Sequence, residues 1–213
     1  MHIEFKHVLP IPLADSPIAP DSCWKKEIGF NTADFFLVEA PSGKGKSTLI
    51  NIFYGTRRDY DGNVLFDGKN INGFSIHHWT KLRQDFFSVV FQELKLFPQL
   101  TAFENIRIKN ELTNTLREDE IHSMSEQLGI SNRLHNKCGT LSLGQQQRVA
   151  IIRALAQPFK FILLDEPFSH LDTENSKIAS ELILNSCKKN KAGLLLTSLG
   201  ETNHFNFTDK IFI

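Results

Sequence analysis

Apolar and polar positions along the chain follow two patterns that alternate. Short apolar runs rich in branched and aromatic residues, each bounded by turn residues, predict buried strands. They are DFFLVEA at 34–40, FFSVVFQ at 86–92, FKFILLDEP at 159–167, AGLLLTSL at 192–199 and DKIFI at 209–213. Stretches with helical spacing lie at 46–55, within 138–158 and at 173–190. Because strands alternate with helices, the predicted fold class is α/β, with a mostly parallel sheet covered by helices on both faces.

The N-terminal part carries strands of a different kind. IEFKHVL at 3–9 and CWKKEIGF at 23–30 predict strands, and GNVLFDGKNI at 62–71 predicts two strands joined by a turn at Asp67-Gly68. Residues 10–22 hold four of the eight prolines, which excludes a helix or a central strand there. We therefore expect an N-terminal antiparallel β part beside the parallel sheet.

Residues 93–140 are more polar than the rest and mostly helical in pattern. A chain of 213 residues is long enough for one domain with a small insert. The expected organisation is a core made of 1–92 and 141–213, with a helical subdomain at 93–140.

Charge and cysteine content exclude several classes of protein. Lys+Arg and Asp+Glu both number 24, so no nucleic-acid partner is expected, because such proteins usually carry a basic excess. Cys23, Cys138 and Cys187 have no metal-ligand spacing and fit a reducing cytosol. We find no pattern of a signal peptide and no apolar run long enough to span a membrane. The expected location is cytoplasmic, with any membrane reached through a partner.

The stretch APSGKGKST, residues 40–48, follows a predicted strand and opens a helix, which is the setting of a P-loop. Its glycines let the backbone wrap closely around a phosphate chain with N–H groups aimed inward. Lys46 would reach the β- and γ-phosphates, Ser47 would ligate Mg²⁺ and Thr48 would contact the α-phosphate. The other predicted nucleotide-binding residues are Ser42, Gly43, Lys44 and Gly45. An accidental glycine-rich turn is the alternative, and the strand–turn–helix setting argues against it.

Two acids end the apolar run FILLDEP. A buried parallel strand presents such residues at its C-terminal edge, where a phosphate chain would lie. Asp165 would hold Mg²⁺ through water, and Glu166 would polarise the attacking water. A strand that simply ends in solvated acids is the alternative, and the P-loop makes it less favoured.

A second anion site is predicted at the start of the helical stretch within 138–158. Ser142 precedes the helix and can cap it, so that the first turn directs free N–H groups and the positive end of the helix dipole outward. Such a helix start suits an anion.

Together these segments resemble the ATP-binding cassette (ABC) family of ATPases over nearly the whole chain, with a P-loop NTPase core. APSGKGKST is similar to Walker A, and FILLDEP to Walker B with its following glutamate. VFQ at 90–92 is similar to the Q-loop, which implies that Gln92 reaches Mg²⁺ and the attacking water. SHLD at 169–172 resembles the D-loop, with Asp172 as its acid, and LSLGQ at 141–145 resembles the family signature.

The resemblance explains the second anion site. In this family two cassettes pair head to tail, and the signature of one chain caps the γ-phosphate held by the other. It implies that Ser142 and Gly144 contact a partner's nucleotide and that Gln145 sits beside it. ATP and Mg²⁺ are the implied ligands, and the partner is a second copy or a paralogous cassette.

Two positions depart from the family. The aromatic ring that usually stacks on adenine is missing, since no Phe, Tyr or Trp occurs between Phe5 and Trp24. An aliphatic or proline contact would then loosen base specificity. The usual switch histidine falls at Leu199, with Ser198 as the next candidate, and neither can donate as an imidazole does. Losing one positioned donor costs about 10²–10³ in rate in other enzymes, so slow hydrolysis is expected.

The segment FQELKLFPQLTAFENI, at 91–106, resembles the region after the Q-loop in lipoprotein-release, macrolide-export and cell-division cassettes. In transporters this region docks a membrane permease; internal packing of the insert is the alternative reading. The resemblance implies the ATP-binding subunit of an ABC transporter, peripheral on the inner face of a membrane. The alternative is a regulatory cassette that binds ATP and dimerises with little hydrolysis. A permease encoded beside this chain would favour the first.

Overall fold

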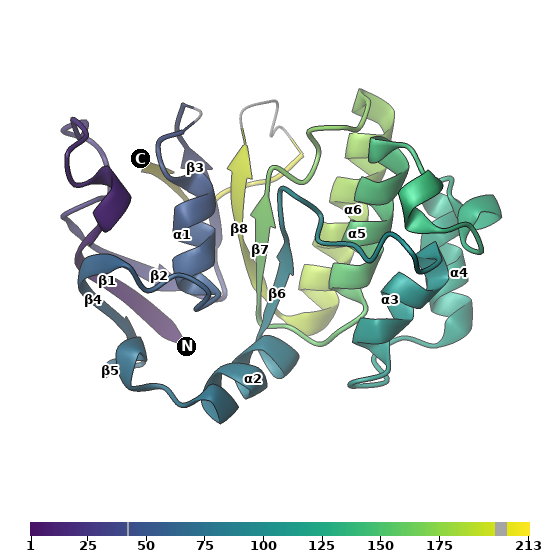
Figure 1. The fold of residues 1–213 in the computed structure, drawn as a ribbon, viewed down its shortest axis with the longest axis horizontal. Coiled ribbons are helices and arrows are strands. Elements are labelled where there is room, and N and C mark those ends of the chain that lie inside the picture. Colours follow the sequence, from purple (N-terminus) through teal and green to yellow (C-terminus); the bar gives the residue numbers. More distant parts are fainter. Residues whose placement is uncertain (42, 199–203) are drawn as a thin grey trace.

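The computed structural model describes residues 1–41, 43–198 and 204–213, which form two β-sheets (Figure 1). One sheet contains β1 (His2–Pro10), β2 (Glu27–Asn31), β4 (Tyr60–Phe66) and β5 (Lys69–Asn70). The other contains β3 (Phe35–Glu39), β6 (Phe87–Val90), β7 (Phe161–Asp165), β8 (Gly193–Ser198) and β9 (Asp209–Phe212). The first is antiparallel in the order β2-β1-β4-β5, and the second is parallel in the order β6-β7-β8-β3-β9. Both parts of the predicted fold class are therefore confirmed.

Helices cover both faces of the parallel sheet. They are α1 (Lys46–Phe53), α2 (Ile76–Asp85), α3 (Ala102–Asn110), α4 (Glu118–Gln127), α5 (Leu143–Leu155) and α6 (Thr173–Asn190). Figure 1 shows α1 between the two sheets, with α5 and α6 on the opposite face of the parallel one. Short 3-10 turns lie at Ile11–Leu13, Ile71–Gly73, Ser131–Arg133 and Cys138–Thr140.

Helix α2 is absent from the predicted elements. Only Trp79 and Leu82 of its ten residues are buried, so its apolar stripe is too narrow to show as a helical pattern.

The parallel sheet is buried on both faces because successive residues of a strand point to opposite sides. On β8, Leu194 and Leu196 join the apolar cluster under α5 and α6, whereas Leu195 joins the cluster that contains α1 and the antiparallel sheet. Aromatic rings fill this second cluster. The Phe53 ring lies 4.8 Å from that of Phe5 and 4.7 Å from that of Phe30, centroid to centroid. These contacts pack α1 against the antiparallel sheet, and the Phe53 ring also lies 6.0 Å from that of Phe161 on β7 of the parallel sheet.

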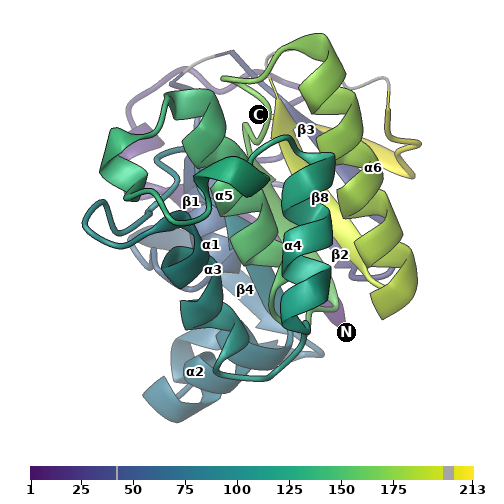
Figure 2. The ribbon, with the colours of Figure 1, turned by 90° about the vertical axis from the view of Figure 1, so that its right-hand side faces the viewer.

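The polar 93–140 segment forms α3 and α4, which Figure 2 shows in front of α5. Ile106 on α3 and Ile121 on α4 share an apolar cluster with Val149 and Ile152 on α5. Its helical character agrees with the sequence, and the division into a core and a subdomain at 93–140 stays a prediction. Across the described ranges we find no helix that combines the length and the apolar character needed to cross a bilayer.

Candidate functional site

The loop between β3 and α1 is shaped by two glycines with left-handed backbones. Gly43 has a φ of 79°, and Gly45, the N-cap of α1, has a φ of 109°. A Cβ at Gly45 would lie 3.0 Å from Leu13 Cδ1, which is a tight contact, and the positive φ strains any side chain there. The first turn of α1 holds no acidic residue, which leaves its positive end suited to an anion. Ser42, a predicted member of this loop, lies outside the described residues.

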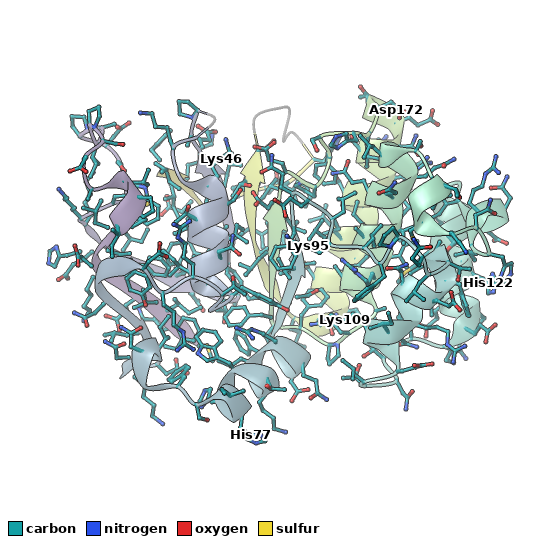
Figure 3. All side chains as sticks on the ribbon, in the orientation of Figure 1. Lys46, His77, Lys95, Lys109, His122 and Asp172 are labelled. Carbon is teal, nitrogen blue, oxygen red and sulfur yellow. The ribbon has the colours of Figure 1, made fainter. Side chains whose placement is uncertain are left out.

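Lys46 is the first residue of α1 and is only 6% exposed. Its Nζ donates to the carbonyl of Ala40 at 2.8 Å and lies 3.5 Å from Glu166 Oε1. Figure 3 shows it at the end of α1 that faces the loop. A buried ammonium is thus held beside the loop by a carbonyl and a carboxylate.

Two further predicted residues lie on either side of the start of α1: Lys44 is in the loop before the helix, and Thr48 is within its first turn. Lys44 is exposed. Thr48 is half-buried, and its Oγ1 accepts from Arg57 Nη1 at 3.3 Å.

Two acids stand at the C-terminal end of β7. Asp165 is 2% exposed, and its Oδ1 accepts from Thr197 Oγ1 on β8 at 2.7 Å. The next residue, Glu166, has a φ of 47°. A left-handed backbone at a non-glycine residue costs roughly 1–3 kcal/mol and is typical of functional sites. Here the left-handed residue is the one whose carboxylate lies 3.5 Å from Lys46 Nζ.

Gln92 follows β6 and reaches the start of α1. Its Oε1 accepts from Ser47 Oγ at 3.3 Å, which brings together two of the three predicted Mg²⁺ ligands. Asp165, the third, ends β7, which is the neighbour of β6. All three offer oxygen, the donor that Mg²⁺ prefers. Within the described ranges no cluster of three His, Cys, Asp or Glu forms a metal site, and a Mg²⁺ site built on one carboxylate and phosphate oxygens needs none.

The sequence interpretation missed Gln147. This α5 side chain is 1% exposed; its Nε2 donates to the Glu166 carbonyl at 3.1 Å and its Oε1 accepts from His170 N–H at 2.8 Å. It ties the start of α5 to the backbone of Glu166 and to the predicted D-loop. The helical spacing indicates that Gln147 is buried, because it lies four residues before Ile151 on the apolar face of the helix.

The predicted signature forms the N-terminus of α5. Ser142 is the N-cap, and a reciprocal capping box links it to Gln145: Ser142 Oγ accepts from Gln145 N–H, and Gln145 Oε1 accepts from Ser142 N–H. The Gln145 amide therefore serves the cap. Close packing requires glycine at position 144, because a Cβ there would lie 2.6 Å from the carbonyl oxygen of His170.

Asp172 is the N-cap of α6. Its Oδ1 accepts from Asn175 N–H at 2.8 Å, and hydrogen bonds from Asn175 lower the pKa of the Asp172 carboxyl. Figure 3 shows it at the outer end of α6, far from Lys46. The structure thus brings Lys46, Ser47, Gln92, Asp165 and Glu166 together. It places Ser142, Gly144 and Asp172 at the starts of α5 and α6, apart from that group.

An apolar cavity of about 120 Å³ adjoins the loop before α1. Its walls come from the proline-rich segment, the loop and the C-terminus; they are Leu13, Ser16, Pro17, Ile18, Ala19, Ser22, Trp24, Pro41, Lys44 and Ile213. Trp24, which forms part of this wall, is only 4% exposed. The residue expected at the switch position, Leu199, lies outside the described residues. Ser198, the alternative, ends β8 and is half-buried.

Known proteins resemble this chain in sequence and in fold. The family model for the ABC transporter matches residues 37–169. The chain is 37% identical over 145 residues to the ABC transporter ATP-binding protein YtrE of Bacillus subtilis, covering 67% of this chain and 63% of that protein. It is 36% identical over 161 residues to the thiamine import ATP-binding protein ThiQ of Shigella flexneri, covering 74% of this chain and 67% of that protein. The chain therefore spans about two thirds of the length of these curated relatives.

The fold also matches a solved bacterial ABC transporter cassette, described as dimeric. That structure has a TM-score of 0.81 and 27% identity, and the match covers 99% of this chain and 94% of that one. The same cassette in a post-hydrolysis state bound to ADP and Pi matches with a TM-score of 0.76 and 28% identity, over 93% of this chain and 88% of that one. Since the family model spans more than half of the residues, the chain belongs to the ABC transporter family.

Proposed function

We propose that this chain is the ATP-binding subunit of an ABC transporter, which hydrolyses Mg-ATP at a head-to-tail dimer interface to power a membrane permease. One observation carries the proposal: groups from three separate segments converge at the N-terminus of α1. Lys46 Nζ lies 3.5 Å from Glu166 Oε1, and Ser47 Oγ lies 3.3 Å from Gln92 Oε1. An ammonium, a hydroxyl, an amide and a carboxylate at one helix start suit phosphoryl transfer to water.

The proposed roles follow from these positions. The N–H groups of the loop and the Lys46 ammonium bind the β- and γ-phosphates, and Thr48 contacts the α-phosphate. When bound, Mg²⁺ neutralises charge on the phosphate oxygens; Ser47, Gln92 and, through water, Asp165 would hold it. Glu166 and Gln92 orient a water molecule toward the γ-phosphorus. The water oxygen forms the new bond while the bond to the leaving ADP oxygen breaks.

A second cassette, either another copy or a paralogue, completes each site. The exposed Ser142 and the half-buried Gly144 at the start of α5 lie apart from Lys46 and offer an anion a second helix N-terminus. In the proposed dimer they contact the nucleotide of the partner. The dimeric description of the similar bacterial cassette supports this arrangement.

The apolar cavity beside the loop is the proposed site of the nucleobase. Lys44 and Pro41 of the loop form part of its wall, so a nucleotide with its phosphates on α1 can extend into it. Aliphatic side chains such as Leu13 and Ile18 would contact the base in place of an aromatic ring. Such contacts are apolar and discriminate weakly between adenine and guanine.

The segment at 91–106 is the proposed docking region for a permease on the cytoplasmic face of a membrane. Within it Phe97 is 54% exposed, whereas Leu94 is 5% exposed. Part of the segment therefore packs inside and part is free for a partner. The name of the thiamine import relative supports a transport role, and neither charge nor fold supports a nucleic-acid partner.

We further propose slow basal turnover, because Leu199 stands at the expected switch position and cannot donate to the γ-phosphate. The same substitution favours the second candidate function, a regulatory cassette that binds ATP and dimerises with little hydrolysis.

The test uses Glu166→Gln with Glu181→Gln, an exposed carboxylate on α6, as the matched control. Glu166→Gln should bind ATP normally and form a stable dimer in Mg-ATP, because the nucleotide holds the interface while cleavage is blocked. Glu181→Gln should behave as the wild type. The measurement is size-exclusion chromatography with light scattering, with and without Mg-ATP. A monomeric Glu166→Gln protein at saturating Mg-ATP would contradict the head-to-tail arrangement.

A further inference from the structure

An exposed histidine lies beside the start of α5, where the partner's nucleotide is proposed to bind. His170 belongs to the segment between β7 and α6. Its carbonyl oxygen packs so closely against Gly144 that a Cβ there would lie 2.6 Å from it. Its backbone N–H donates to Gln147 Oε1 at 2.8 Å, one turn further along α5. The backbone of His170 is therefore held against the N-terminal half of α5, next to one of the proposed phosphate contacts.

Hydrogen bonds around the imidazole favour one tautomer. The Gln147 amide is oriented by two backbone groups, because its Oε1 accepts from the His170 N–H and its Nε2 donates to the Glu166 carbonyl. The same Nε2 donates to Ser169 Oγ at 3.4 Å, and Ser169 Oγ lies 2.9 Å from His170 Nδ1. Since Ser169 Oγ accepts from the amide, its own proton is available to Nδ1, which then acts as an acceptor. We therefore place the proton of the neutral His170 ring on Nε2.

The Nε2–H of His170 is left as a donor. In the described parts of the chain, the hydrogen bonds of His170 are made by its backbone N–H and by Nδ1, and none by Nε2. The acids nearest in sequence are occupied: Glu166 lies 3.5 Å from Lys46 Nζ. Asp172 accepts from the Asn175 N–H at 2.8 Å. Water satisfies an exposed donor in a single chain, but a donor covered by a second chain needs an acceptor, because an unpaired buried polar group is costly.

The phosphate of a partner's nucleotide would supply that acceptor. Gly144, against which His170 packs, and Ser142, two residues earlier, are the proposed contacts of the partner's γ-phosphate. Ser142 offers a hydroxyl, and α5 offers the N–H groups and the positive dipole end of its first turn. The imidazole adds a donor from a different segment of the chain. Leu199, at the expected switch position, has an aliphatic side chain and offers none.

We propose that His170 of one chain donates a hydrogen bond through Nε2 to the γ-phosphate held by the P-loop of a second copy, and so supplies the donor that Leu199 lacks. This inference rests on the proposed function, which provides the paired cassettes and the phosphate, and it adds a catalytic residue from the second copy. The imidazole keeps its proton and stabilises the negative charge on the phosphate oxygens in the transition state. The slow turnover expected with leucine at position 199 then depends on His170.

The first experiment measures phosphate release by the whole chain at saturating Mg-ATP. His170→Leu should lower kcat about 10²-fold, the lower end of the range for one positioned donor. His170→Gln should keep most of the rate, because an amide N–H can take the place of the Nε2–H. Dilute, unpaired chains of both variants should bind ATP as the wild type does, since His170 does not touch the nucleotide of its own chain.

His77→Leu is the matched control, because His77 is an exposed histidine on α2. Figure 3 shows it on the opposite side of the molecule from Asp172, which lies two residues after His170. This variant should keep the wild-type kcat. Because His170 is exposed, its variants should also keep the wild-type Tm, measured by circular dichroism.

The second experiment tests whether the histidine acts across the pair. The variants His170→Leu and Glu166→Gln are mixed in equal amounts, and single-turnover phosphate release is followed. In a mixed pair, one site combines the P-loop and Glu166 of the first chain with His170 of the second. The mixture should therefore show a fast phase at the wild-type rate, which neither variant shows alone. A histidine that acts within its own chain gives no such phase, because the intact His170 then belongs to the chain without Glu166.

Two results would overturn the proposal: a His170→Leu protein with the wild-type kcat, or a mixture without the fast phase. Equal losses in His170→Leu and His170→Gln would also contradict it, since they would show that the donor is not what matters. Failure of the proposed function has a different signature. A wild-type chain that releases no phosphate, with Glu166→Gln monomeric in Mg-ATP, would remove the partner's phosphate and overturn both.

Discussion

Replacing Gln147 by methionine keeps the length of the side chain but removes three hydrogen bonds to the segment after β7. Two of them join α5 to backbone groups of Glu166 and His170, and the third reaches Ser169 Oγ at 3.4 Å. The His170 N–H then loses its acceptor, whereas the Glu166 carbonyl keeps a weaker donor, the N–H of Ser169 at 3.3 Å. The His170 N–H is only partly buried, so leaving it unpaired costs about 1 kcal/mol, the low end of the range for a buried polar group. A loss of about 1 kcal/mol corresponds to a fall of roughly 2–4 °C in Tm for a chain of this size.

The assay is thermal unfolding followed by circular dichroism, beside steady-state phosphate release. Gln127→Met on α4 is the control, because Gln127 is exposed and its side chain donates to Ser123 Oγ on the same helix. The stability of this variant should stay within about 0.5 kcal/mol of the wild type. In Gln147→Met, kcat should fall more than ATP affinity, since the Glu166 backbone is released while the loop before α1 is untouched. If Gln147→Met had the same Tm as Gln127→Met, the argument that these hydrogen bonds stabilise the fold would be refuted.

Three further predictions test the site and the core. With no aromatic stack, which is worth about 1–3 kcal/mol in nucleic-acid proteins, ATP and GTP should bind with similar affinity in calorimetric titration; a strong preference for ATP would point to another base contact. Leu199→His should raise kcat for phosphate release with little change in ATP affinity, because the added donor acts as charge develops. An unchanged kcat would show that residue 199 is not the switch position. Burial raises the pKa of three thiols, so native protein should resist Ellman's reagent at mildly alkaline pH until unfolded; the values are about 12 for Cys23, about 11 for Cys138 and about 12 for Cys187.

The parts of the site that the sequence predicted are those in which chemistry and local structure share one short segment. The stretch 40–48 holds its glycines, its lysine and its helix start together, and FILLDEP holds a buried strand with its acids. Parallel strands then deliver both to one edge of the sheet, so the pairing of Lys46 with Glu166 followed from topology.

The parts that the sequence did not predict depend on packing between distant segments. Helix α2 buries only Trp79 and Leu82, and the resulting pattern is too sparse for a helix prediction. Lys109 on α3 interacts electrostatically with Arg83 on α2 and Arg153 on α5, and nothing local to Lys109 indicates that these two arginines lie near it. The position of Asp172 before a helix also predicts the capping role that the structure shows, whereas the resemblance implies only that it is the acid of the D-loop.

Helix α5 connects three functional regions that lie far apart in sequence. Its N-cap, Ser142, is the proposed contact with the partner's nucleotide, Gln147 holds the backbone of Glu166, and Arg153 holds the carbonyls after Gln92. Ser142 and Arg153 are separated by about 16 Å along the helix axis. Because α5 is a continuous helix of 13 residues with a buried apolar face, the three contacts are joined by one rigid element. A displacement of Arg153 would therefore be transmitted along α5 to Gln147 and to Ser142, without any change in the P-loop itself.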